Sequence, residues 1–481
     1  MRLRNGLAGA AMALVPIGAA FAQAAPAAPA TDPAALLQRL EEAETRIKVL
    51  ERKLEIQKED ATAAAASAPQ VRAGGTRFSL GNADGSSFVR LRGVLQADGR
   101  HFEGDASPAT SNTWILRRVR PIVEGTFANL YDFRFTPDFA QGKTVIQDAY
   151  IVARFKPFAA VTVGKFKVPV GLERIQSATD LRFIERGFPT SLLPNRDLGV
   201  QLGGEVAGGL FSYNVSYTNG VSDGGSSDGN ASPDVENDAK GDVSARVFFQ
   251  PFLSSDTFAL RGLGFGVAGT YVDSIGSATN TLLASYKTPG QATFFNWRTT
   301  TAAAGTTAAV NGTFASGERL RISPQFYYYY NSFGLLGEYV NVKQDVSRVI
   351  GAVTSSDSLD IKAWQLQFSW LLTGEEQTFR SPNPAEPFQV GKPGWGAWEL
   401  VARVHELSID DDAFLGGAAS FANPATAARK AKAAGIGVNW YLNQNVKWQL
   451  DYDLTRFDGG AANGGDRADE KAIFTRVGLQ F

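Results

Sequence analysis

The chain has 481 residues, of which 44% are hydrophobic and 20% are charged, and it contains no cysteine and only two histidines. This composition excludes a disulfide framework and a cysteine nucleophile, and it leaves little room for a metal site built from Cys or His. The formal charge of −1 argues against a protein that coats nucleic acid. The mean hydropathy of −0.13 is too polar for a helical membrane bundle. It allows a membrane β-barrel, in which only alternate residues meet lipid.

The first 22 residues have the pattern of a secretory signal peptide. Arg2 and Arg4 precede an apolar stretch that ends in Ala20-Phe21-Ala22, an A-x-A cleavage pattern. The alternative, a transmembrane anchor, needs about 20 apolar residues with stop-transfer flanks. No other apolar run is long enough to span a bilayer as a helix, so a mature chain in a membrane would have to cross it with strands.

Between linkers at residues 23–35 and 61–75, the sequence predicts a short coiled-coil helix over residues 36–60. Apolar positions recur at alternating spacings of four and three, and charged residues fill the other faces. The seam consists of Leu36, Leu40, Ala43, Ile47, Leu50, Leu54 and Gln57. A single solvated helix and a spacer facing the peptidoglycan remain alternatives to a helix that trimerises.

From Phe88 to Phe481 the apolar residues follow a period of two, which is typical of β-strands. In residues 211–218, large apolar side chains alternate with Ser, Asn and Thr, and residues 364–370 and 446–455 alternate in the same way. A soluble β-sandwich alternates too, but a secreted chain with balanced charge and a terminal aromatic residue favours a transmembrane barrel, with its apolar face toward lipid. We therefore predict an all-β barrel domain over residues 76–481.

The alternation predicts sixteen antiparallel strands. They begin near Phe88, Thr113, Tyr131, Val145, Val161, Gly199, Leu210, Asp242, Leu263, Arg319, Phe333, Leu359, Ala397, Ala434, Val446 and Ala472. Short turns interleave with long Gly/Ser/Ala-rich connections, as expected for the periplasmic and exterior ends of such a barrel. Two connections where short turns are expected, residues 251–262 and 374–396, are too long for this pattern. The lumen of a barrel of this size stays open to water.

The third long connection, residues 169–199, mixes Leu, Ile and Phe with arginines, unlike the other loops. We predict that it folds into the barrel and presents Arg174, Arg182, Arg186 and Arg196 to the pore. Alternatively the loop covers the outer surface, or nearby acids neutralise the arginines. These acids are Glu173, Asp180, Glu185 and Asp197.

Three segments resemble the phosphate-selective porins O and P of Gram-negative outer membranes: "VGKFKVPVGLERIQSATDLRFIERGFPTSLLPNRDLGVQL" at residues 163–202, "WILRRVR" at 114–120 and "FTPDF" at 135–139. The similarity extends from about Gly74 to Phe481. It implies a trimeric sixteen-stranded barrel with an inward third loop, and a pore lined by arginine and lysine that carries phosphate or polyphosphate.

The strand pattern itself places a stripe of cations on the lumen wall. Its members are Arg90, Arg92, Arg118, Arg120, Arg134, Lys165 and Lys167. With the four loop arginines, these are the candidate anion-binding and pore-lining residues, because such a stripe concentrates anions and repels cations. Glu124, Asp132, Asp138 and Asp148 share the wall and reduce the effect.

The sequence thus predicts a passive diffusion channel for small anions, with phosphate or polyphosphate as candidates. A general, weakly selective porin and a secreted β protein without a channel are the alternatives. Neither His101 nor His405 belongs to a recognisable catalytic triad, so we expect no enzyme, no cofactor and no metal. The expected partners are outer-membrane lipid, small anions such as phosphate and two further copies of the chain, with no nucleic acid. The expected location is the outer membrane, with the N-terminal helix in the periplasm.

Overall fold

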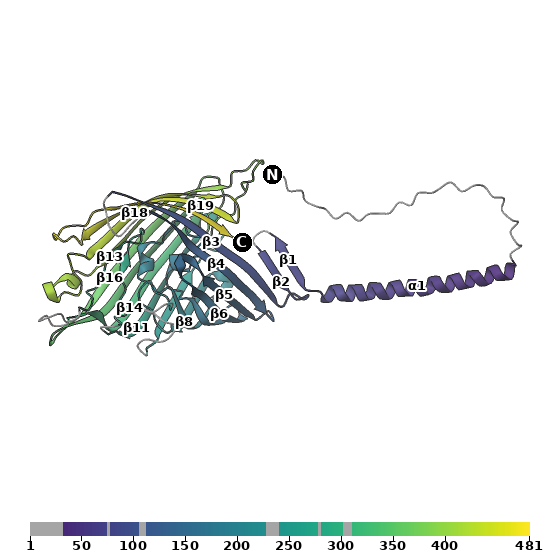
Figure 1. Ribbon diagram of the computed structural model, residues 1–481, viewed down its shortest axis with the longest axis horizontal. Helices are drawn as coiled ribbons and strands as arrows, with labels where there is room; N and C mark the ends of the chain where they lie inside the picture. Colours follow the sequence, from purple (N-terminus) through teal and green to yellow (C-terminus); the bar gives the residue numbers. More distant parts are fainter. Residues whose placement is uncertain (1–31, 75–76, 105–111, 228–239, 278–279, 302–309) are drawn as a thin grey trace. The chain divides into compact units, whose positions relative to one another are not determined.

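The computed structural model describes residues 32–74, 77–104, 112–227, 240–277, 280–301 and 310–481 (Figure 1). The predicted signal peptide and most of the first linker lie outside the described residues. The chain divides into two units, Met1–Ala68 and Pro69–Phe481.

The described part of the first unit is one long helix, α1 (Pro33–Ser67). Asp32 caps it, with its carboxylate 3.1 Å from the backbone nitrogen of Ala34, and proline is favoured at the first helical position. The expected coiled-coil segment 36–60 lies within α1, but the second linker is wrong in part, because the helix continues through the alanine-rich residues after position 60. Alanine has the highest helix propensity, so this composition extends the helix. None of the described helices is both long and apolar enough to cross a membrane.

The second unit is a closed antiparallel barrel of sixteen strands, as the alternation predicts (Figure 1). The strands are β3 (Phe88–Glu103), β4 (Thr113–Phe127), β5 (Tyr131–Asp138), β6 (Val145–Lys156), β7 (Ala159–Lys167), β8 (Arg196–Val206), β9 (Phe211–Thr218), β10 (Asp242–Phe249), β11 (Leu263–Ile275), β14 (Val310–Tyr330), β15 (Phe333–Ile350), β16 (Val353–Leu371), β17 (Ala397–Ile409), β18 (Ala428–Tyr441), β19 (Val446–Gly459) and β20 (Glu470–Gln480). The last strand pairs with the first, from Lys471 with Glu103 to Gln480 with Val94. Backbone hydrogen bonds of 3.0 and 3.1 Å between Gly93 and the terminal Phe481 complete this seam.

The barrel wall exposes its apolar side chains and buries its polar ones, which is the reverse of a soluble protein. On β16 the apolar Leu366, Phe368 and Trp370 are each about 40% exposed, whereas the alternating Gln365, Gln367 and Ser369 are buried. A sandwich would bury the apolar set instead. The outer face therefore suits lipid and the inner face suits a polar lumen.

A hairpin of β1 (Gln70–Gly74) and β2 (Arg77–Gly81) precedes the barrel, and β2 pairs with the first residues of β3. The sheet thus begins at Gln70. The expected linker over residues 61–75 therefore contains the end of α1 and all of β1. The period-two signal of a five-residue strand is too short to be recognised beside an alanine-rich segment.

Short turns gather at one end of the barrel, here called the short-turn end, and most long connections at the other, the long-loop end. Two differences from the expected asymmetry stand out. The connection between β15 and β16 at the long-loop end is only a two-residue turn, residues 351–352, because these strands are long. Conversely, two of the connections at the short-turn end are long, residues 250–262 and 372–396.

The connections also contain short elements. These are α2 (Leu172–Ile175), η1 (Ala140–Gly142), η2 (Phe188–Ser191), η3 (Ala207–Gly209), η4 (Phe258–Leu260), η5 (Asp411–Phe414), η6 (Gly417–Ala419), β12 (Tyr286–Lys287) and β13 (Thr293–Phe295). The β12–β13 hairpin, residues 413–427 and the connection between β7 and β8 form a buried apolar cluster with the inward faces of β15–β18. Phe188, Phe294 and Phe295 are at its centre, each at most 2% exposed. This cluster fills one side of the lumen, so a solute path has to follow the other side.

Candidate functional site

The connection between β7 and β8, residues 168–195, folds into the barrel as predicted, and we call it the inner loop. Its backbone is held by side chains of the β15–β20 wall: Leu172 N donates to Glu338 Oε1 at 2.7 Å, and Ile184 N donates to Asp451 Oδ2 at 2.6 Å. Phe188 N also donates, to Nδ1 of His405 at 3.1 Å. Buried acceptors of this kind fix a loop because the backbone donors would otherwise be left unsatisfied. The inner loop thus lies against one wall and leaves space toward the opposite wall.

That space contains a cavity of about 260 Å³ between the inner loop and strands β4–β8. Eight of its sixteen lining residues are Arg or Lys, and only one, Asp138, is acidic. The cations are Arg117, Arg118, Arg120, Lys143, Lys167, Arg174, Arg186 and Arg196. Six of these are sequence-predicted site residues, and they come from two strands of the wall, the inner loop and the start of β8.

Two consecutive arginines of β4 reach this cavity because the strand has a β-bulge. Gln96 pairs with Arg118 and Ala97 pairs with Leu116, so Arg117 is the extra residue opposite the neighbouring strand. A bulge interrupts the alternation of faces. Strict alternation puts Arg117 on the lipid face, which is why sequence reasoning missed it. The doublet Arg117-Arg118 followed by Arg120 is the one available signal, since an arginine facing lipid is costly.

Several of the cavity's cations have carboxylate partners. Arg117 binds Glu185 in a bidentate ion pair with 3.0 and 3.3 Å contacts, Arg120 binds Asp138 at 2.7 Å, and Arg196 binds Asp148 at 2.8 Å. These pairs hold the guanidinium groups in place and cancel part of their charge. None of the loop acids lies within ion-pair distance of Arg174, Arg186 or Arg196 among the described residues, although the charges of Glu173 and Glu185 offset part of that of Arg186. Glu185 pairs with the wall residues Arg100 and Arg117 rather than with Arg174, Arg186 or Arg196.

Apart from the exposed Lys143, four other cations of the cavity have no carboxylate within ion-pair distance among the described residues: Arg118, Lys167, Arg174 and Arg186. Neutral oxygens hold them instead. Arg118 donates to Gln96 Oε1 at 2.6 Å, Lys167 donates to the carbonyl of Gln176 at 2.6 Å, and Arg186 donates to the same carbonyl at 3.0 Å. Arg174 donates to the carbonyl of Thr190. The cavity therefore has a large net positive charge that a mobile anion can offset.

The pKa values of the inner loop agree with this charge distribution. Burial and the neighbouring charges of Arg186 and Arg196 lower the pKa of Arg174 to about 9, so its guanidinium is still protonated at pH 7. Burial alone would raise the pKa of Glu185, but the charges of Arg117 and Arg100 hold it well below its usual range. Crowded cations that lower one another's pKa form a site that favours an anion.

A second cavity of about 540 Å³ adjoins the first on the side of the long loops. Arg117, Arg174, Arg186 and Asn195 line both cavities, and the second is completed by residues 222–225 and 283–291. The arginines thus stand at the junction of two consecutive spaces. A solute entering between the long loops meets them on its way inward.

The remaining predicted residues lie elsewhere. Arg90, Arg92 and Arg134 surround Glu124 at 3.3, 3.4 and 2.6 Å on the inner face of the same wall, nearer the short-turn end. Lys165 is buried, donates to the carbonyl of Ser227 and does not line the cavity.

Arg182 does not line the cavity and is buried in an ion pair with Glu399 at 2.8 Å. It also donates to Gln377 Oε1 at 2.7 Å and to the carbonyls of Thr378 and Arg380 at 2.7 and 3.0 Å. The prediction that it faces the pore is therefore wrong. Its role is to join the inner loop to the connection at residues 372–396.

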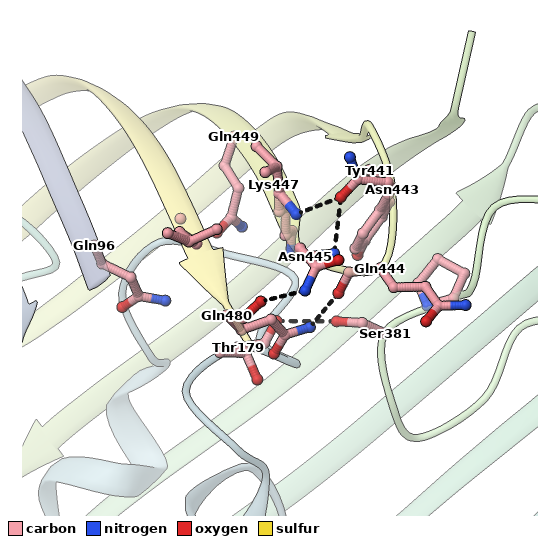
Figure 2. A pocket seen from close by; sticks show the side chains of 14 residues that line it. Gln96, Thr179, Ser381, Tyr441, Asn443, Gln444, Asn445, Lys447, Gln449 and Gln480 are labelled. Atoms are coloured by element: carbon pink, nitrogen blue, oxygen red, sulfur yellow. Dashed lines mark hydrogen bonds between the residues drawn. The ribbon is translucent and has the colours of Figure 1, made fainter. Parts of the chain in front are cut away.

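This connection enters the barrel from the short-turn end. Ser381 Oγ donates to the carbonyl of Thr179 at 2.9 Å, a contact drawn in Figure 2, and its backbone nitrogen donates to Asp180 at 3.0 Å. Beside it, Gln96, Asn445 and Gln480 border a small pocket of about 30 Å³ (Figure 2). The connection is longer than a turn because it reaches into the barrel and contacts the inner loop from the short-turn end. Within the described ranges, no three Asp, Glu or His side chains come together as metal ligands would.

The comparisons with known proteins agree with this architecture. A family model described as "Phosphate-selective porin O and P" matches residues 89–481. The chain belongs to this porin family. Family and fold are those of a channel, and together they place the chain in the outer membrane.

Among curated proteins, Porin O of Pseudomonas aeruginosa PAO1 is 33% identical over 127 residues, which are 25% of this chain and 28% of that protein. The matched part thus spans little more than a quarter of the relative. Among solved structures, the outer membrane channel DcaP of Acinetobacter baumannii has a TM-score of 0.50 at 12% identity, covering 82% of this chain and 98% of that chain. An anion-selective porin from Comamonas acidovorans has a TM-score of 0.48 at 13% identity, with coverages of 82% and 100%. The resemblance inferred from residues 114–202 is confirmed by the family match.

Proposed function

We propose that the protein is a passive diffusion channel that carries small anions across the outer membrane, with phosphate or short polyphosphate as its preferred solutes. The observation that carries this proposal is the cavity beside the inner loop, in which Arg118, Lys167, Arg174 and Arg186 have no carboxylate partner among the described residues. An anion gains from these charges, whereas a cation is repelled.

Passage requires weak binding at several successive positions. Arg117, Arg174 and Arg186 line both the outer and the inner cavity, so an anion can keep some guanidinium contacts while it forms the next. Beyond them, Arg90, Arg92 and Arg134 share the single acid Glu124, which leaves a positive balance further along the same wall. Phosphate suits this arrangement because guanidinium groups bind its oxygens in pairs.

A current measurement with phosphate tests the solute preference. The full chain is inserted into a planar bilayer in KCl, and inorganic phosphate is added to one side. We expect a saturable block of the chloride current, and a weaker block in Arg186→Gln. A chloride current that phosphate leaves unchanged would contradict the phosphate preference and leave a channel for small anions in general.

We also propose the assembly and placement that the sequence suggests: three copies in outer-membrane lipid, with residues 1–22 removed and α1 in the periplasm. On α1 the seam residues Leu40, Ile47, Leu50 and Leu54 are 54–58% exposed. Three copies would bury these side chains in a coiled coil. Light scattering of the full chain in detergent tests this, with Leu50→Glu expected to weaken the trimer and Glu51→Gln, on a solvated face, expected to leave it intact.

A further inference from the structure

The two long connections at the short-turn end form a second kind of cavity together with the end of β14. It has a volume of about 550 Å³, within the range of small-molecule sites, about 300–1,000 Å³. Five of its thirteen lining residues are aromatic: Phe258, Tyr327, Tyr329, Tyr330 and Phe379. Neither the anion path nor the family match assigns a role to it.

The aromatic rings form two walls. Tyr327 lies 5.0 Å from Tyr329 and 5.5 Å from Phe379, measured between ring centroids. Phe258 and Tyr330 are 5.9 Å apart and are 49% and 37% exposed, and Tyr330 lies on the outward face of β14. Tyr327 and Tyr329 face the lumen and Tyr330 faces outward, so the two walls lie on the two faces of β14 and meet at the end of the strand.

Both connections are held in place, so the cavity exists without a ligand. Residues 250–262 are tied to β14 by Tyr328, whose hydroxyl donates to the carbonyl of Ala259 at 2.8 Å. Residues 372–396 are tied by Gln377, whose backbone nitrogen donates to the carbonyl of Asn331 at 2.6 Å and whose amide binds Glu399 at 2.6 Å. A preformed cavity loses little conformational entropy when a ligand binds.

The polar groups that line the cavity indicate which class of ligand it can bind. No hydrogen bond joins the hydroxyl of Tyr327, Tyr329 or Tyr330 to another described residue. The charged lining residues are one cation, Arg261, and one anion, Glu376. The charges balance, which disfavours a simple anion or cation. Apolar ring faces edged by free hydroxyls, amides and a balanced pair of charges fit a neutral polyhydroxylated ring.

We infer that this aromatic cavity binds a glycan at the short-turn mouth of the barrel, with one pyranose unit stacked on the ring of Phe379 and another on the ring of Phe258. The sugar hydroxyls bond to the tyrosine hydroxyls and to Glu376. This site is separate from the anion path and does not depend on its selectivity.

Titration calorimetry of the full chain with tri-N-acetylchitotriose tests the inference. The detergent must carry no sugar head group, because an alkyl glycoside would compete. We expect saturable binding, weakened about tenfold in Phe258→Ala and in Phe379→Ala, which corresponds to about 1.4 kcal/mol for a lost ring contact. Trp395→Ala is the matched control, because Trp395 is a 72% exposed aromatic residue on the same connection that does not line the cavity.

Three results would overturn the inference. The first is an absence of glycan binding by the folded protein. The second is equal binding by the wild type and both phenylalanine variants. The third is binding of benzoate or choline in preference to the glycan, which would assign the cavity to an aromatic anion or to a quaternary cation. In every case the reversal potential of Phe258→Ala should equal that of the wild type, because Phe258 is not part of the anion path.

Discussion

Removing one unpaired cation from the cavity should lower the preference for anions by about tenfold. Arg118→Gln is the most suitable change, because Gln removes the charge and keeps a polar amide beside Gln96. The residue is 3% exposed and lines the cavity beside the inner loop. The variant therefore removes one positive charge from the lining and, because Gln is shorter, can only widen the cavity.

The size of the effect follows from Coulomb's law. A sphere of the cavity's volume has a radius of about 4 Å, so an ion near its centre is about 6 Å from a lining charge. At this separation the Coulomb energy between two unit charges in water is about 0.7 kcal/mol. The charge stabilises an anion and destabilises a cation by similar amounts. Removing the charge therefore changes the difference between the free energies of chloride and potassium in the cavity by about 1.4 kcal/mol. This corresponds to a change of about tenfold in the permeability ratio. Screening at 0.1 M salt acts over about 10 Å, so it removes only part of this effect.

Reversal potentials of single channels in a KCl gradient measure the ratio directly. Arg429→Gln is the control, because this arginine is 48% exposed, pairs with Asp458 and does not line the cavity. We expect the control to match the wild type. A change of less than twofold in Arg118→Gln, with conductance retained, would refute the assignment of the cavity as the selective part of the pore.

Three further predictions concern the framework around the cavity. Arg182→Gln should destabilise the protein by about 3–5 kcal/mol because it leaves Glu399 charged and buried, and combining it with Glu399→Gln should restore much of the loss, as measured by the temperature at which the barrel unfolds on a gel. Thr179→Cys with Ser381→Cys should form a disulfide in this cysteine-free chain and leave the conductance unchanged, because the hydroxyl of Ser381 already contacts the backbone carbonyl of Thr179; a cysteine pair that stays reduced under oxidising conditions would contradict the described contact. Ile436→Arg, on the outer face of β18 and 64% exposed, should lower barrel stability in lipid by up to about 2–4 kcal/mol, and an unchanged denaturant midpoint would argue against lipid contact there.

Much of the barrel could be predicted from the sequence because each strand has an apolar side and a polar side. The predicted starts at Phe88, Thr113, Tyr131 and Val446 coincide with strand starts in the structure. The start expected near Arg319 differs, since β14 begins at Val310. Its first residues project toward the long loops, where contact with lipid no longer imposes alternation.

The candidate site could be predicted only in part, for reasons that lie in the backbone and in long-range pairing. The inward fold of the loop could be predicted from its composition, and most of the cavity cations could be predicted from the alternation of residues along the strands. Arg117 could not be predicted, because a bulge changes which face a residue occupies. The positions of Arg182 and Lys165 depend on partners distant in sequence, Glu399 and Ser227, which no local pattern reveals.

The role of residues 372–396 also could not be predicted from local sequence patterns. The segment differs from a short turn only in its length, and its contacts with Thr179 and Asp180 are about 200 positions away in the chain. Such contacts become visible only once the strands have closed into a barrel. The same holds for the aromatic cavity, whose lining comes from two connections and the end of one strand.

We propose that the arginine-lined cavity makes this porin favour anions. The most direct test is the reversal potential of the wild-type channel under a tenfold KCl gradient at neutral pH. The arrangement of Arg118, Lys167, Arg174 and Arg186 predicts a potential of the sign set by chloride, and one that shrinks as the salt concentration rises. A potential near zero, or one of the sign set by potassium, would contradict the claim.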